Sequence, residues 1–245
     1  MTIIANPIYD TVFKFLMEDN RVAKILLSAL LQKEVVEVQM RQTEYTDSNR
    51  PKISMFRLDF AAKIREKDGK EHTVLIELQK TWRLSETLRF RQYLGTQYLD
   101  KENIPVTKEN SKRFALPMIS IYILGHKLGD LQEPVVYVRR RYLDQDSNPI
   151  VRGVPDPFIE SLTHDTIIVQ IPYLKGRIRS HLDRLLNLFD QDYRLKEDEH
   201  LLEFDEEKLQ GNDEQLVMYR LVKAAAAPKV RRSMQVEDEV LSELE

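Results

Sequence analysis

The chain has 245 residues and a formal net charge of −3, and 31% of its residues carry a charge. It contains no Cys, which excludes disulfides, thiolate zinc sites and Cys nucleophiles. No apolar run approaches the roughly 20 residues of a membrane span, and residues 1–7 lack the features of a signal peptide, so we expect a cytoplasmic protein with no membrane part.

The charge is unevenly distributed along the chain. Residues 1–180 hold 28 Lys and Arg against 23 Asp and Glu, whereas residues 181–245 hold 9 against 17. A mildly basic globular part is compatible with nucleic-acid binding, and an acidic tail is typical of a solvated segment or of one that contacts a basic surface. We therefore predict a main domain over 1–190 and an acidic C-terminal extension over 191–245, helical or partly disordered.

Two helices and a strand are expected in the first part of the chain. Asn6 and Pro7 form a helix-start signal, with Asn6 as N-cap and Pro7 in the first helical position, ahead of a short helix over 8–17. Apolar spacing predicts a second helix over 21–32, and a strand follows over 35–41. Residues 44–52 have the composition of a polar loop.

Further elements alternate between helix and strand. The pattern predicts a helix over 84–100, a charged loop over 101–113 and a buried strand over 116–124. Further strands are expected over 135–142 and 166–171, and an amphipathic helix over 178–189. This order, helix–helix–strand–strand–strand–helix–strand before the later additions, indicates an α/β fold with a mixed β-sheet flanked by helices.

Two neighbouring strands, over 57–62 and 74–79, each carry one carboxylate within an apolar run. These carboxylates are Asp59 and Glu77. Burying an unpaired carboxylate is costly, so such a group normally has a cation, a metal or a hydrogen-bond network beside it. Two of them on adjacent strands suggest a divalent metal.

The turn between these strands sets their pairing. A three-residue loop over 67–69, with Gly69 in the left-handed conformation, makes Asp59 face Glu77. Glu77 and Gln79 then share one face of the strand, because side chains alternate along it. A register slip of one residue would destroy this convergence.

Several motifs resemble, in their order and spacing, the PD-(D/E)XK nuclease superfamily, and in particular its transposase-like branch of recombination-promoting nucleases of bacteria. The resemblance covers residues 5–125 well and extends more weakly to about 190. The motifs that carry it are Asn6-Pro7-Ile8-Tyr9-Asp10-Thr11-Val12-Phe13-Lys14, Leu58-Asp59-Phe60, Ile76-Glu77-Leu78-Gln79-Lys80 and Arg89-Phe90-Arg91-Gln92-Tyr93, followed by the strand over 116–124.

The resemblance implies a restriction-endonuclease-like fold and hydrolysis of DNA phosphodiesters with Mg²⁺, or Mn²⁺, linked to transposition or recombination. Asp59, Glu77 and the backbone carbonyl of Leu78 would hold the metal, and Gln79 would hold the attacking water. Two positions depart from the superfamily pattern: Leu58 replaces its Pro, and Gln79 stands where many members have Lys. Gln can orient water but supplies no positive charge. A homodimer would suit the cleavage of both DNA strands.

Each site residue also has a structural interpretation. Asp59 and Glu77 could form an ion-pair network with Arg57, Lys63 or Arg91, and we weigh this against metal ligation. Asp10 and Lys14 stand four residues apart on a helix. They are either a surface ion pair or, by resemblance, a group near the metal and a phosphate contact.

Other basic residues have equally open roles. Arg89, Arg91 and Tyr93 would contact DNA by resemblance, since the guanidinium binds phosphate well, or they would pair with Glu77 or face solvent. The run over 139–141 would follow a DNA backbone or be a charged edge strand. The alternative to an endonuclease is a catalytically weak module of the same fold that regulates by binding DNA or protein.

Overall fold

The computed structural model describes residues 1–41, 56–81, 87–104 and 114–242. Within these ranges, the side chains of 56–59, 77–81, 87–89, 93, 102 and 240–242 lie outside the description. The polar loop expected over 44–52 also lies outside the described residues.

Six strands form the central mixed sheet, in the order β2-β3-β4-β5-β7-β6, and two more form a separate pair, β1-β8. In the large sheet, β2, β3 and β4 are antiparallel neighbours, β4, β5 and β7 run parallel, and β6 is an antiparallel edge strand. The strands are β1 (Thr2–Ala5), β2 (Glu34–Arg41), β3 (Phe56–Arg65), β4 (Glu71–Thr81), β5 (Met118–Leu124), β6 (Val135–Val138), β7 (His164–Gln170) and β8 (Leu201–Phe204).

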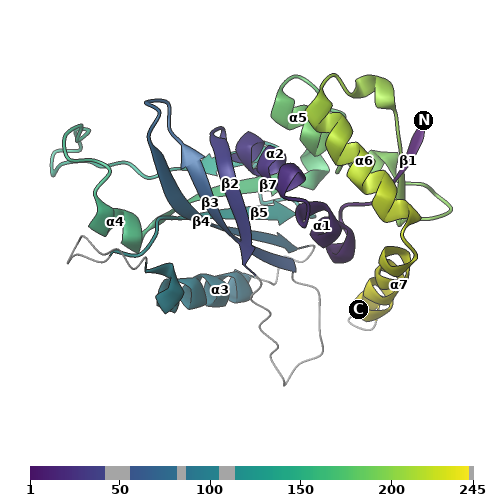
Figure 1. The fold of residues 1–245 in the computed structure, drawn as a ribbon, viewed down its shortest axis with the longest axis horizontal. Coiled ribbons are helices and arrows are strands. Elements are labelled where there is room, and N and C mark those ends of the chain that lie inside the picture. The colour runs from purple at the N-terminus through teal and green to yellow at the C-terminus, as the bar shows by residue number, and fades with distance from the viewer. Residues whose placement is uncertain (42–55, 82–86, 105–113, 243–245) are drawn as a thin grey trace.

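The helices flank this sheet, so the expected α/β class with a mixed sheet is confirmed. Figure 1 shows α3 lying apart from the group formed by α1, α2, α5 and α6. None of the helices in the described ranges is long and apolar enough to cross a membrane. The helices are α1 (Asp10–Met17), α2 (Asn20–Leu31), α3 (Thr87–Leu99), α4 (Pro157–Leu162), α5 (His181–Asn187), α6 (Asn212–Ala226) and α7 (Pro228–Ser242).

The β3–β4 hairpin has the predicted register. The Glu66 amide donates to the Lys70 carbonyl at 2.8 Å, and this hydrogen bond closes a three-residue loop over 67–69. Gly69 adopts the left-handed φ of +84° that this loop requires. Asp59 is therefore the direct cross-strand partner of Glu77, as expected.

One face of the sheet, which we call the core face, is packed with apolar side chains. Its strand residues share a single cluster with buried residues of α1, α2, α5 and α6. Because the strand side chains of this face are apolar, their burial supplies the main hydrophobic stabilisation of the fold. The strand residues are Phe60, Ala62, Ile64, Val74, Ile76, Ile121, Ile123, Ile167 and Val169.

The first and last parts of the chain are interleaved. β1 pairs antiparallel with β8, and the Glu237 carboxylate on α7 accepts hydrogen bonds from the Asp10 and Thr11 amides, each at 2.8 Å. This carboxylate takes the free N–H groups of the first turn of α1, where a helix favours negative charge. The segment predicted as an extension over 191–245 thus contributes β8, α6 and α7 to the packing around the N-terminal residues. The domain boundary near residue 190 stays a prediction.

The helix start expected at Asn6 and Pro7 is wrong. The Asn6 side chain instead accepts from the Ile8 amide at 3.2 Å and donates to the Glu199 carbonyl at 3.0 Å. These bonds hold residues 6–9 in a turn, and the helix begins at Asp10. A long-range contact therefore uses the side chain that the local pattern assigned to the cap.

Candidate functional site

The second face of the sheet, which we call the site face, carries the candidate metal ligands by register. Cross-strand partners lie on one face, so the row Arg41, Asp59, Glu77, Ser120 and Thr166 crosses five strands from β2 to β7. The strand positions of Asp59 and Glu77 are described, while their side chains are not. The predicted convergence is thus confirmed for the backbone.

Gln79 and Leu78 follow Glu77 along β4. Gln79 lies two residues on, at a site-face position opposite Tyr122 of β5, whereas Leu78 is in register with core-face Ile121. The side chains of Gln79 and Leu78 lie outside the description. Their roles as water holder and carbonyl ligand stay predictions.

Ser120 is a further residue of this row, and the sequence analysis did not single it out. It is fully buried at the centre of β5, and its Oγ has no hydrogen-bond partner in the described part of the chain. A buried hydroxyl normally finds a partner. The only sequence signal for it is one serine within the apolar strand Met118–Leu124.

Helix α3 covers part of the site face. The ring of Phe90 lies 4.9 Å from that of Tyr122, and the Tyr98 hydroxyl is 2.6 Å from His164 Nδ1. Both Tyr122 and His164 occupy site-face positions. The helix therefore forms a second layer over the face that carries Asp59 and Glu77.

A buried amide network anchors the end of α3 to β2. Asn103 is 2% exposed, and its Nδ2 donates to the carbonyl and the side-chain oxygen of Gln97. Its Oδ1 accepts from Arg41 Nη1 at 2.6 Å. Since Arg41 is the cross-strand partner of Asp59, this network fixes the strand next to the candidate site.

The cations of the alternative ion-pair network have different surroundings. Lys63 pairs with Glu71 at 2.9 Å, at the far end of the hairpin from Asp59. Arg91 is exposed on α3, and the side chain of Arg57 lies outside the description. The Lys63–Glu71 pair removes one of the three cations proposed as partners of the carboxylates.

The predicted DNA contacts divide between two layers of the fold. Arg91 is on α3, over the site face, as are Arg89 and Tyr93, whose side chains lie outside the description. Asp10 and Lys14 are on α1, which packs through Phe13 and Met17 near Ile123 on the core face. The structure thus brings Asp10 and Lys14 to the layer opposite Asp59, and their predicted roles stay predictions.

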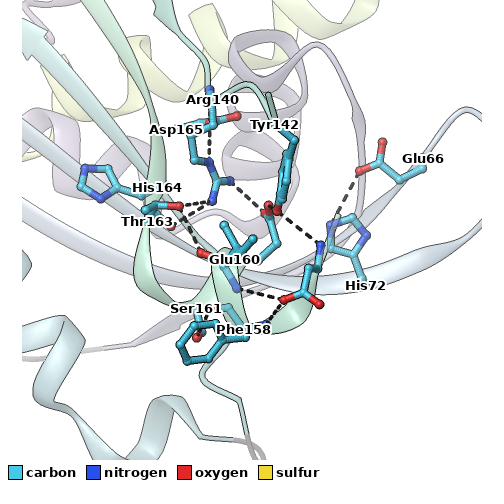
Figure 2. A network of polar contacts seen from close by, with 12 residues as sticks. Glu66, His72, Arg140, Tyr142, Phe158, Glu160, Ser161, Thr163, His164 and Asp165 are labelled. Carbon is cyan, nitrogen blue, oxygen red and sulfur yellow. Dashed lines mark hydrogen bonds and ion pairs between the residues drawn. The ribbon is translucent and has the colours of Figure 1, made fainter. Parts of the chain in front are cut away.

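The basic run over 139–141 follows strand β6, which ends at Val138. Arg140 donates to Asp165 Oδ1 at 2.8 Å and to Glu160 Oε2 at 2.9 Å, and it also bonds Thr163 (Figure 2). The strand expected to reach residue 142 is therefore shorter, and Arg140 is a structural ion-pair residue that ties α4 to β7.

Two side chains with a perturbed pKa are His164 on the site face and Tyr9 near Asp238 of α7. Burial lowers the pKa of His164, and the charge of Arg140 lowers it further. Burial also raises the pKa of Tyr9, and the carboxylate of Asp238 adds to this effect. Both shifts favour the neutral side chain in the folded protein.

No group of three or more His, Asp or Glu that could hold a metal occurs among the described side chains. The side chains of Asp59 and Glu77 are outside that set. The candidate metal site therefore rests on the backbone register and on the chemistry of the two carboxylates.

No family model matches this chain, and neither the curated proteins nor the solved structures yield a match. The nuclease resemblance of the motifs therefore stays an expectation.

Proposed function

We propose that this protein is a divalent-metal-dependent DNA endonuclease with a restriction-endonuclease-like fold, which hydrolyses phosphodiester bonds. The observation that carries the proposal is the pairing of Asp59 with Glu77 in the hairpin. Directly opposed residues have Cβ atoms about 4.5–5.5 Å apart, and two like charges at that separation destabilise a sheet. A cation bound between the two carboxylates would remove this repulsion. The pair is therefore more favourable with a bound metal than without one.

The donor set fits Mg²⁺ or Mn²⁺, which prefer oxygen ligands. Asp59, Glu77 and the Leu78 carbonyl would hold the ion, and the bound ion would supply a Lewis acid and a water of lowered pKa. Gln79, two residues further on the same face, would orient the attacking water through its side-chain amide. None of these roles requires a positive charge at residue 79.

DNA is the proposed substrate because of the motif resemblance and the excess of positive charge in residues 1–180. Arg89, Arg91 and Tyr93 belong to the helix that covers the site face, where they would contact the backbone of the nucleic acid. Lys14 would contribute a phosphate contact and Asp10 a group near the metal-bound water. A homodimer, with one site for each strand, would account for double-strand cleavage.

Plasmid cleavage with Mg²⁺ and with Mn²⁺ tests the proposal on the wild type, Asp59→Asn and Glu77→Gln. Both substitutions keep the shape of the side chain and remove a ligand charge, so we expect each to lower the cleavage rate at least ~100-fold, the scale of removing one electrostatic stabiliser. Asp68→Asn is the matched control, because Asp68 is an exposed carboxylate in the turn of the same hairpin. It should cut like the wild type.

Thermal unfolding with and without metal gives a second readout. A metal present at 100 times its Kd stabilises the native state by about 2.7 kcal/mol, and we expect this gain in the wild type and in Asp68→Asn only. A wild type that neither cuts DNA nor gains stability from either metal would contradict the proposal. The chain would then be read as a binding module whose strand carboxylates are structural.

A further inference from the structure

The hydroxyl of Ser120 stands out among the buried polar atoms that lack a hydrogen-bond partner in the described residues. The others are His126 Nδ1, Asn187 Nδ2 and Glu214 Oε2. Asn187 still accepts a bond from Tyr193 through Oδ1, and the second carboxylate oxygen of Glu214 binds Arg184 at 2.7 Å. Ser120 has one polar side-chain atom, it is 0% exposed, and that atom has no partner among the described residues.

The position of Ser120 in the sheet shows which neighbouring groups could accept a hydrogen bond from this hydroxyl. On one side its register partner is Glu77 of β4, and on the other it is Thr166 of β7. The neighbours along the same face of β5 are Met118 and Tyr122, which flank the hydroxyl with an apolar side chain and an aromatic ring. Among the cross-strand partners, Glu77 is the one that carries a full charge.

We infer that Ser120 is a positioning residue of the metal site, whose hydroxyl donates a hydrogen bond to the carboxylate of Glu77 when that carboxylate holds the metal. This inference rests on the proposed function, since it assumes that Glu77 is a metal ligand. A carboxylate that binds a metal through one oxygen keeps acceptor capacity on the other, and such ligands are normally held by a hydrogen bond from a neighbouring group. Ser120 supplies that donor from the adjacent strand.

The apolar surroundings make this bond effective. A hydrogen bond to a charged acceptor is stronger than one between neutral groups, and burial strengthens it further. The bond also fixes the orientation of the Glu77 carboxylate, because a strand residue in the middle of the sheet cannot shift relative to its neighbour. Ser120 therefore acts on metal affinity through Glu77 and does not itself touch the metal or the substrate.

Mn²⁺ binding to the full chain, measured by titration calorimetry, tests this role on the wild type, Ser120→Ala, Thr166→Val and Glu77→Gln. Thr166→Val is the matched control, because it also removes one hydroxyl from the site face but lies two strands from Glu77, roughly 9.6 Å away at the usual strand spacing. We expect Glu77→Gln to abolish binding. Ser120→Ala should weaken it about 10- to 100-fold, the usual effect of losing such a partner, and Thr166→Val should change it less than about twofold, since it removes no such partner.

Urea unfolding in the absence of metal separates positioning from simple stabilisation. Removing a hydroxyl that has no partner costs the metal-free protein nothing, so Ser120→Ala should unfold at the same or a higher urea concentration than the wild type. The inference is overturned if Ser120→Ala keeps the wild-type Kd, if it destabilises the metal-free protein, or if Thr166→Val weakens binding equally.

Different results would rule out the proposed metal site and the role of Ser120. A wild type that binds no Mn²⁺ removes the proposed function and the role of Ser120 together. A wild type that binds Mn²⁺ through Glu77, combined with an unaffected Ser120→Ala, removes the role of Ser120 alone.

Discussion

Ser120 and Ile121 are neighbours on β5, yet they belong to two faces of the sheet that are built by different rules. Ile121 lies on the core face, where four helices bury apolar side chains against the apolar residues of the strands. Ser120 lies on the site face, where the row from Arg41 to Thr166 holds three charged residues followed by two hydroxyl residues. The core face therefore holds the fold together, and the site face can carry charged and hydroxyl groups that the fold alone would not favour.

The largest effect is expected on the core face. Ile121→Ala removes a fully buried side chain and leaves a cavity in the middle of the sheet, so the free energy of unfolding should fall by about 2–5 kcal/mol. Urea denaturation of this variant beside Ser120→Ala compares the two faces at adjacent residues. An equal loss in both variants would break the distinction between them.

An intermediate effect is expected where α3 is fastened over the site face. Asn103→Ala leaves the Gln97 groups and Arg41 without their buried partner, which should lower the free energy of unfolding by about 1–3 kcal/mol. Faster amide hydrogen exchange in α3 than in α2 would show that the loss is local. Unchanged hydrogen exchange in α3 would mean that the contacts of Phe90 and Tyr98, and not Asn103, hold this helix on the site face.

The smallest effect is a pH dependence at His164. Burial, and then the charge of Arg140, lower its pKa in the folded state, so the unfolded chain binds a proton first as the pH falls. The free energy of unfolding should therefore rise with pH between the lowered pKa and the ordinary value of about 6.5. His164→Gln keeps a side-chain amide for the Tyr98 hydroxyl and should flatten this rise, as measured by urea denaturation at several pH values. The same rise of the free energy of unfolding with pH in both proteins would contradict its attribution to His164.

Local signals in the sequence suffice to predict the hairpin and the helices α1, α2, α3 and α5. Gly69 specifies the turn, and the turn fixes the register that opposes Asp59 and Glu77. The class of fold follows from the alternation of apolar periods along the chain, which is a property of neighbouring residues. These features are predictable because short-range geometry decides them.

Features set by distant residues were not predictable. β1 and β8 are four residues long and pair across about two hundred positions, so neither has a strand signal of its own. Asn6 has the composition of an N-cap, but Glu199 and Gln191 take its side chain. The missing partner of Ser120 depends on which strands lie beside β5, and this pairing is invisible in the apolar run that contains it.

The pairing of β1 with β8 also constrains how the chain is made. Residues 2–5 leave the ribosome long before their strand partner over 201–204, which is synthesised about 200 residues later. At about 5–20 residues per second, this delay lasts roughly 10–40 s. During that interval the large sheet can assemble while the edge of β1 stays uncovered. The nascent chain therefore exposes an apolar strand until its partner is made, and chaperone demand should fall once residues 201–204 emerge.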